Sequence, residues 1–282
     1  MKILTFDIEE WFHLLDNNLA NTETSWETYE VRIHKNMERI YKILDETNTQ
    51  ATFFCLGWIA KKYPEIIKQI DQLGYEIGCH SDQHQLVYEL SPALFKRDTE
   101  VAINRLEDIL GKKIKSYRAP CFSFTSETPW AFEVLASLGI THDSSIFPSA
   151  RIQGGYVNFP SKMPSILNCN GIHIKEIPIT TTKFLGQNIV FSGGGYFRLF
   201  PYSFIHYWTK KQDFVMAYMH PRDLDADQPM INELSLSRKF KSYYGLNTAE
   251  AKFKKWLTDF KFTDIREFDK NFDWNNAKII NL

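Results

Sequence analysis

The chain has 282 residues, of which 44% are hydrophobic and 24% are charged. This composition is that of a globular protein and excludes disordered and fibrous classes. Its 33 basic and 34 acidic residues give a formal net charge of -1, so we expect no nucleic-acid partner. The first residues lack the apolar run of a signal peptide, and no stretch approaches the length of a membrane span. We therefore expect a cytoplasmic protein without a transmembrane segment.

Aromatic and cysteine residues give two further expectations. Aromatic residues make up 15% of the chain, and because flat rings stack on sugar faces as well as in a core, this content mildly favours a carbohydrate partner. The four cysteines include no Cys-x-x-Cys pair, and a chain of this length does not depend on disulfides. We expect free thiols at Cys55, Cys79, Cys121 and Cys169.

The first half of the chain alternates between short apolar runs and amphipathic stretches. The apolar runs predict strands at residues 2–6, 51–56, 75–79, 114–117 and 140–142. Helical spacing of apolar residues predicts helices at 31–44, 59–73, 91–110 and 128–138. Three of these helices are followed by glycine, the residue best suited to a left-handed helix cap: Gly74, Gly111 and Gly139.

The second half of the chain begins with a segment that breaks this alternation. Residues 149–182 are rich in Pro, Gly and Asn, and we interpret them as an insertion that contains a β-hairpin. Beyond it, the pattern predicts a helix at 202–211, a strand at 214–219, a helix at 248–260 and a terminal strand at 263–268. No linker or repeat divides the chain, so one domain is predicted for residues 1–282.

Repeated strand–helix units predict an α/β fold, because right-handed crossovers connect parallel strands. The number of units and the chain length favour a closed barrel over an open sheet. In such a barrel the carboxyl ends of all strands share one face, and active sites are built there. Polar residues that follow the predicted strands are therefore candidates for a common site.

Two histidines four residues apart, His80 and His84, follow the third predicted strand. Alone, this pair is equally consistent with a surface turn. A carboxylate as third ligand would complete a site for zinc or a similar divalent ion, with an open position for water or substrate. Asp7 and Glu9 end the first strand, and one could bind the ion while the other takes a proton from water. Glu10 is better explained as a cap of the following helix.

Three further polar residues end predicted strands. Arg118 could pair with Asp7 and orient it, or form an ordinary salt bridge at the barrel rim. His220 could protonate a leaving amine, or be a hydrogen-bonded core histidine. Asp143 could orient His220, or cap a helix N-terminus.

Together, these residues form motifs that resemble the polysaccharide deacetylase family, the metal-dependent enzymes of carbohydrate esterase family four. The motifs follow the family's order over residues 5–221: Thr5-Phe6-Asp7-x-Glu9, His80-Ser81-x-x-His84, Arg118-x-Pro120, Asp143 and His220-Pro221. Residues 6–13 and 193–198 are similar to a bacterial subgroup linked to exopolysaccharide biosynthesis. Residues 193–198 could be a substrate-binding loop or a turn before the next helix.

The resemblance implies a distorted (β/α) barrel, often of seven strands, that removes an N-acetyl group from an amino sugar. By position it makes Asp7 the general base, Arg118 its orienting partner, His220 the general acid and Asp143 the partner of His220. It assigns one divalent cation, expected to be Zn²⁺, to Glu9, His80 and His84. It assigns substrate contacts to Pro120, Cys121 and Phe122, with a backbone N–H near Cys121 stabilising the oxyanion.

The sequence departs from the family pattern at two positions and leaves alternatives open. Glu9 stands where the family usually has Asp, and Cys121 stands where it usually has an aromatic residue. Related proteins of the same chemistry cleave formamides or cyclic imides, so these substrates are an alternative. Glu9 and the aromatic content leave open a catalytically silent sugar-binding subunit of a polysaccharide-synthesis complex. The oligomeric state is open and includes a homo-oligomer.

Overall fold

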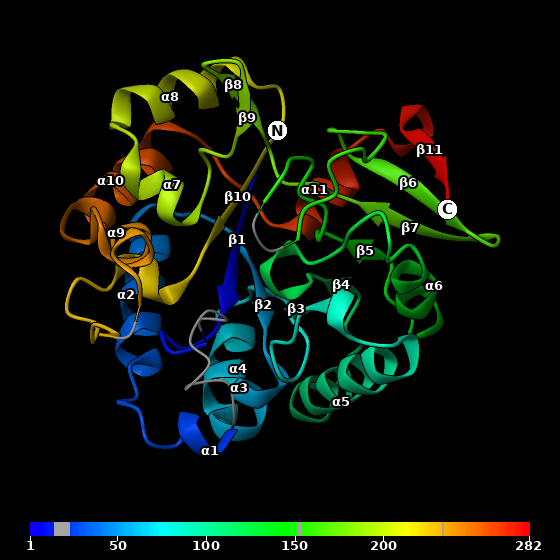
Figure 1. Ribbon diagram of the computed structural model, residues 1–282, viewed down its shortest axis with the longest axis horizontal. Helices are drawn as coiled ribbons and strands as arrows, with labels where there is room; N and C mark the ends of the chain where they lie inside the picture. Colours follow the sequence, from blue (N-terminus) through cyan, green and yellow to red (C-terminus); the bar gives the residue numbers. More distant parts are fainter. Residues whose placement is uncertain (14–22, 152–153, 233) are drawn as a thin grey trace.

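The computed structural model describes residues 1–13, 23–151, 154–232 and 234–282 (Figure 1). Its main sheet has nine strands in the order β10-β1-β2-β3-β4-β5-β7-β6-β11. These strands are β1 Lys2–Ile8, β2 Thr52–Cys55, β3 Glu76–Cys79, β4 Ser116–Tyr117, β5 His142–Asp143, β6 Ser165–Cys169, β7 Ile172–Glu176, β10 Val215–Met219 and β11 Lys278–Asn281. A separate antiparallel pair consists of β8 Thr182–Phe184 and β9 Gln187–Ile189.

The helices pack along the outside of this sheet, and Figure 1 shows α2, α3, α5 and α6 following one another around it. The first six are α1 Glu23–Trp26, α2 Ile33–Glu46, α3 Gly57–Lys62, α4 Pro64–Gln72, α5 Pro92–Leu110 and α6 Trp130–Ser137. The others are α7 Gly194–Leu199, α8 Tyr202–Lys211, α9 Leu236–Tyr243, α10 Leu246–Asp259 and α11 Ile265–Asn271. Short 3₁₀ turns are η1 Val87–Glu89, η2 Pro120–Phe122, η3 Pro221–Leu224 and η4 Trp274–Asn276.

Seven consecutive strands of the main sheet, from β10 through β1 to β5 and β7, are parallel. Every residue of β2 and β10 is buried, as expected for parallel strands that are covered on both faces. The predicted α/β fold with a parallel sheet is confirmed. Among the described residues no pairing joins β10 to β11, so the strands are not closed into a barrel in this structure.

The predicted hairpin is present, but it belongs to the main sheet. Strands β6 and β7 pair in antiparallel register, and β7 continues the parallel sheet beside β5. β11 then pairs in parallel with β6 and forms the edge. The segment 149–182 therefore extends the sheet instead of interrupting it, although its residues 152 and 153 lie outside the described residues.

Two predicted elements differ from the structure. The helix expected at 59–73 is divided at Tyr63 into α3 and α4, and Pro64 is the first residue of α4. The terminal strand expected at 263–268 is wrong, because residues 265–271 form helix α11. The Asp264 side chain accepts a hydrogen bond from the backbone N–H of Glu267 and so caps this helix.

The buried residues of the central strands are mostly apolar, although Thr5 is buried within β1. Within the described residues, no helix combines the length and the apolar composition needed to cross a bilayer. Charged groups such as Asp7 and Arg118 are nevertheless buried at the carboxyl ends of β1 and β4. Because burying an unpaired charge is costly, each of these groups must have a partner there. These buried charged groups and their partners make up the candidate site.

Candidate metal centre and active site

Parallel strands bring six of the predicted residues to the same edge of the sheet. Asp7 and Glu9 lie at the end of β1. The first residues after β3, β4 and β10 supply three of the others, and the turn after β3 supplies His84. Because the carboxyl ends of parallel strands lie at one edge, side chains far apart in sequence become neighbours there. The residues brought together are Asp7, Glu9, His80, His84, Arg118 and His220.

Glu9, His80 and His84 form a compact group of metal-ligating side chains. All three are buried, and one ligand atom from each lies within 4.8 Å of the other two. His80 Nδ1 is 2.8 Å from the carbonyl oxygen of Arg118, and because a carbonyl only accepts, this nitrogen is the donor. The tautomer leaves Nε2 of His80 free to act as a ligand, as in most histidine metal sites.

A tight turn produces the four-residue spacing of the two histidines. Ser81 and His84 both have left-handed backbone conformations, with φ of 67° and 54°. The Ser81 hydroxyl oxygen accepts a hydrogen bond from the backbone N–H of His84 at 3.1 Å. The turn therefore folds His84 back beside His80, and the two ring centroids are 5.5 Å apart.

The donor set fits a divalent cation of the zinc type. Glu9 Oε2 is buried and has no aligned hydrogen-bond donor, although His84 Nε2 lies 2.7 Å away. Two imidazole nitrogens and one carboxylate oxygen are the ligands of many catalytic zinc sites. A buried carboxylate oxygen beside an imidazole nitrogen is what such a site would contain. Glu9, one methylene longer than Asp, thus reaches the two histidines.

The protonation states of Glu9 and His80 suit metal binding. Burial alone would raise the pKa of Glu9, but His84, His220 and His80 outweigh it and lower that pKa to about 2. Burial lowers the pKa of His80 to about 4. An ionised carboxylate and a neutral imidazole are the forms that ligate metals, and both prevail at neutral pH.

Arg118 pairs with Asp7, as the sequence predicts. Its guanidinium is fully buried, and Nη1 donates to Asp7 Oδ1 at 2.8 Å and to the hydroxyl of Thr5 at 2.6 Å. The carbonyl and hydroxyl oxygens of Ser144 accept from its Nε and Nη2. With its donors occupied on several sides, Arg118 is held rigidly and fixes the orientation of the Asp7 carboxylate.

His220 points into the same site from the end of β10. Its Nε2 lies 3.8 Å from Asp7 Oδ2 and 3.7 Å from Glu9 Oε1. Its Nδ1 forms a 2.8 Å hydrogen bond with Asp223 Oδ2. Burial alone would lower the pKa of His220, but the Asp223 carboxylate raises it to about 9. His220 therefore carries a proton on Nε2 at neutral pH and can donate it.

The expected pairing of Asp143 with His220 is wrong. Asp143 accepts hydrogen bonds from the backbone N–H and the hydroxyl of Ser145, and it borders the buried Glu176. Asp223 takes its place because the turn η3, with Pro221 as its first residue, folds the Asp223 side chain back onto His220. In the sequence, a proline followed two residues later by Asp indicates the start of a helix. This pattern was the signal that could have indicated the contact between Asp223 and His220.

Arg198 is a second residue whose place the sequence left open. It lies in helix α7, within the glycine-rich segment 193–198, and its Nε is 3.1 Å from Asp223 Oδ1. Arg198 and Asp223 are both buried. The segment therefore contributes a cation to the partner of His220.

The predicted substrate contacts lie in the turn η2, directly after β4. Cys121 and Phe122 have left-handed backbones, with φ of 51° and 53°, which is unusual for two successive residues other than glycine. Cys121 is partly exposed, whereas Phe122 is buried and packs edge-on against Tyr218 with ring centroids 4.9 Å apart. Pro120 is buried as well. Contact of these residues with a substrate stays a prediction.

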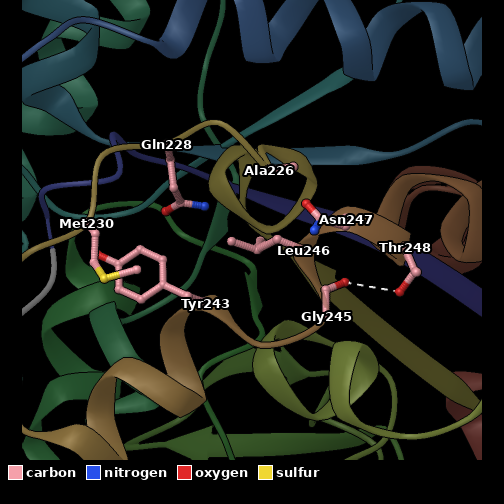
Figure 2. A pocket seen from close by; sticks show the side chains of 8 residues that line it. All are labelled: Ala226, Gln228, Met230, Tyr243, Gly245, Leu246, Asn247 and Thr248. Atoms are coloured by element: carbon pink, nitrogen blue, oxygen red, sulfur yellow. Dashed lines mark hydrogen bonds between the residues drawn. The ribbon is translucent and has the colours of Figure 1, made fainter.

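A cavity of about 260 Å³ lies between the 226–230 segment and the start of α10, and Figure 2 shows its lining. None of its lining residues belongs to the predicted site. Two of its polar side chains have partners: the Gln228 amide donates to the carbonyls of Arg222 and Asp225, and the Tyr243 hydroxyl contacts Pro229 and Ile231. These bonds hold the chain after η3 in place.

Two family models match the chain in succession. The polysaccharide deacetylase model matches residues 17–142, and a model described as a domain of unknown function (DUF3473) matches residues 144–270. The first match contains His80, His84 and Arg118, whereas His220 lies in the second. The chain resembles the peptidoglycan-N-acetylglucosamine deacetylase of Bacillus cereus, with 36% identity over 80 residues, 26% of this chain and 29% of that protein. It resembles the chitooligosaccharide deacetylase of Azorhizobium caulinodans, with 30% identity over 89 residues, 31% of this chain and 42% of that protein.

Solved structures of low sequence identity share the fold. A Mycobacterium smegmatis protein classed as a polysaccharide deacetylase matches with a TM-score of 0.65 and 19% identity, over 100% of this chain and 92% of its own. A carbohydrate esterase family 4 pseudoenzyme from Bacillus anthracis matches with a TM-score of 0.51 and 15% identity, over 99% of this chain and 66% of its own. The matches to the two curated deacetylases described above cover less than half of the length of each relative. The family model and the curated relatives thus show that part of this chain, including residues 17–142, is similar to polysaccharide deacetylases.

Proposed function

We propose that this protein is a metal-dependent hydrolase that removes an N-acetyl group from an amino sugar in a polysaccharide or its biosynthetic precursor. The observation that carries the proposal is the convergence of Glu9, His80 and His84 at one strand edge, with Asp7 and His220 beside them. The relatives named as deacetylases of peptidoglycan and chitooligosaccharide support this substrate class.

Each residue of the site has a role in this reaction. Glu9, His80 and His84 would hold one divalent cation, expected to be Zn²⁺, which when bound supplies a Lewis acid and lowers the pKa of water. Asp7, oriented by Arg118, takes the proton of the attacking water as its oxygen bonds to the acyl carbon. A backbone N–H near Cys121 would donate to the oxyanion.

Breakdown of the tetrahedral intermediate requires an acid. As the C–N bond breaks, the proton on Nε2 of His220 transfers to the departing nitrogen, and the products are acetate and a free amine. Asp223 supports this step because its carboxylate holds Nδ1 of His220 and favours the protonated ring. Asp7 and His220 Nε2 face each other at 3.8 Å, so base and acid act on the same small volume.

The biological setting is the less direct part of the proposal. The similarity of residues 6–13 and 193–198 to an exopolysaccharide-associated subgroup supports a role in exopolysaccharide biosynthesis. A cytoplasmic location would place the enzyme beside soluble or lipid-linked precursors. Strands from both matched regions share one sheet, which supports a single domain over residues 1–282.

An acetate-release assay on N-acetylglucosamine oligomers tests the proposed function. We expect activity that is lost with a chelator, recovers with Zn²⁺ and falls at least about 100-fold in His80→Ala. His173→Ala is the matched control, because His173 is an exposed histidine near the amino-terminal end of β7, whereas the candidate site lies at the carboxyl ends of the strands. Activity that survives both the chelator and His80→Ala would overturn the metal mechanism. Formyl and cyclic-imide substrates assayed in parallel would identify the alternative hydrolases.

One contact favours a second candidate, a silent sugar-binding protein. Glu9 Oε2 and His84 Nε2 are 2.7 Å apart and could satisfy each other as an ion pair without any cation. In that case the purified protein would contain no stoichiometric metal and would bind sugar oligomers without releasing acetate. One tightly bound metal ion per chain excludes this candidate.

A further inference from the structure

The Asp223 carboxylate lies between two cationic side chains. Its Oδ2 accepts hydrogen bonds from Nδ1 and from the backbone N–H of His220, at 2.8 and 3.0 Å. Its Oδ1 is 3.1 Å from Nε of Arg198, an ion pair without an aligned hydrogen bond. The orientation of Asp223 is therefore set by His220 on one side and Arg198 on the other.

Arg198 itself is held by the end of helix α9. Its Nη1 donates to the carbonyl oxygens of Ser242 and Tyr244 at 2.9 and 3.0 Å, and its Nη2 donates to that of Lys241 at 3.1 Å. These carbonyls lie at a helix C-terminus, where they lack partners within the helix and where positive charge is favoured. Three backbone carbonyls thus fix the planar guanidinium of Arg198, whose Nε lies beside Asp223.

The stability of the fold does not by itself explain the contact between Arg198 and Asp223. Arg198 is 5% exposed, and burying a guanidinium is costly unless its donors are used. Lys252, a neighbouring cation, stabilises the same region by donating to the carbonyls of Phe197, Arg198 and Phe200, and no contact joins it to Asp223. Arg198, by contrast, extends from the helix end to the carboxylate that holds His220.

We propose that Arg198 is a positioning residue of the active site, which acts by fixing Asp223 and thereby the direction of His220 Nε2. This inference rests on the proposed function, because it treats His220 as the group that donates a proton to the leaving amine. The rigid connection from α9 through Arg198 and Asp223 keeps Nε2 near Asp7 and Glu9, at 3.8 and 3.7 Å. Loss of Arg198 would let Asp223 and the imidazole rotate.

A kinetic double-mutant cycle tests the proposal. Arg198→Ala should lower kcat for acetate release about 10-fold or more with KM changed less than about 2-fold, since the Arg198 guanidinium is buried and its contacts lie within the protein. Arg198→Lys should restore part of kcat, because it keeps the charge without the fork geometry. In an Asp223→Asn background, Arg198→Ala should cost less than about 3-fold, because the two residues act in series.

Lys252→Met is the matched control. It removes a partly buried cation that contacts α7 but not Asp223, so it should reduce thermal stability while kcat stays within about 2-fold of wild type. A fall in kcat for Lys252→Met equal to that for Arg198→Ala would overturn the proposal and leave a structural role. Additive effects of Arg198→Ala and Asp223→Asn would overturn it as well.

A crystal structure of Arg198→Ala separates failure of this inference from failure of the proposed function. We expect Asp223 to leave its wild-type rotamer and the His220 ring to turn away from Asp7, whether or not the protein releases acetate. If wild type proves inactive while these shifts occur, the proposed function fails and the positioning role stands. If Asp223 and His220 keep their wild-type positions, the positioning role is refuted.

Discussion

At the residue scale, the buried residues Asp143 and Asp223 are the two candidate partners of His220. Asp223 contacts Nδ1 of His220 at 2.8 Å, whereas Asp143 hydrogen-bonds Ser145. Asp223→Asn should therefore lower kcat for acetate release by about 10²-fold, since the ring loses the carboxylate that orients and charges it. Asp143→Asn, the matched control, should retain kcat within about 5-fold in the same assay. A larger loss of kcat in Asp143→Asn than in Asp223→Asn would contradict the geometry.

The same residues show what a sequence can predict of a site. Asp7, Glu9 and His80 were predictable because each ends or follows an apolar strand, and topology alone then places them at one edge. Asp223 was missed, although Pro221 followed two residues later by Asp223 is a local signal for the turn η3 after His220. The contact of Arg198 with Asp223 joins residues of different elements and leaves no local pattern.

At the element scale, helix α11 shows how a cap outweighs a strand-like pattern. Apolar residues at 262, 265 and 268 suit either element, and the Asp264 side chain decides by accepting from the N–H of Glu267 at 2.7 Å. Asp264 is buried and also pairs with Arg266, whereas the Ser91 cap of α5 accepts from the N–H of Leu94 at 3.3 Å. We expect Asp264→Ala to cost about 1–2 kcal/mol and Ser91→Ala about 1 kcal/mol or less. Urea unfolding of both variants checks this, and a smaller loss in Asp264→Ala would contradict it.

Most other elements follow from local chemistry. The helix at 202–211 agrees with α8, and the glycines at 74, 111 and 139 have the left-handed conformation expected after a helix. Whether the strands close into a barrel does not follow, because closure depends on pairing between the two edges of the sheet. The hairpin β6–β7 and the edge strand β11 extend the sheet on one side, and a local hydrophobic pattern cannot encode that pairing.

At the scale of the whole molecule, a buried carboxyl pair couples stability to pH. Burial and the neighbouring Asp143 raise the pKa of Glu176 well above its ordinary 4.5, and burial raises that of Asp143. A carboxyl whose pKa is higher in the folded chain holds its proton more tightly there. Its contribution to stability is complete below pH 4.5 and is lost as the pH rises through the folded-state pKa.

Glu176→Gln should therefore flatten this pH dependence. The amide keeps an oxygen for the backbone N–H of Ile146 but does not ionise. We expect the free energy of unfolding of the variant to gain on that of wild type above pH 4.5, by up to about 1.4 kcal/mol per pH unit. Urea unfolding between about pH 4 and pH 8 measures this difference. Parallel curves for the two proteins would show that Glu176 does not titrate in this range.

The central claim is that Glu9, His80 and His84 bind one divalent cation at the carboxyl ends of the strands. Calorimetric titration of metal-free protein with Zn²⁺ tests it most directly. We expect one tight site per chain in wild type and in His173→Ala, and loss of that site in His80→Ala. Absence of a tight site in wild type, or an unchanged site in His80→Ala, would contradict the claim.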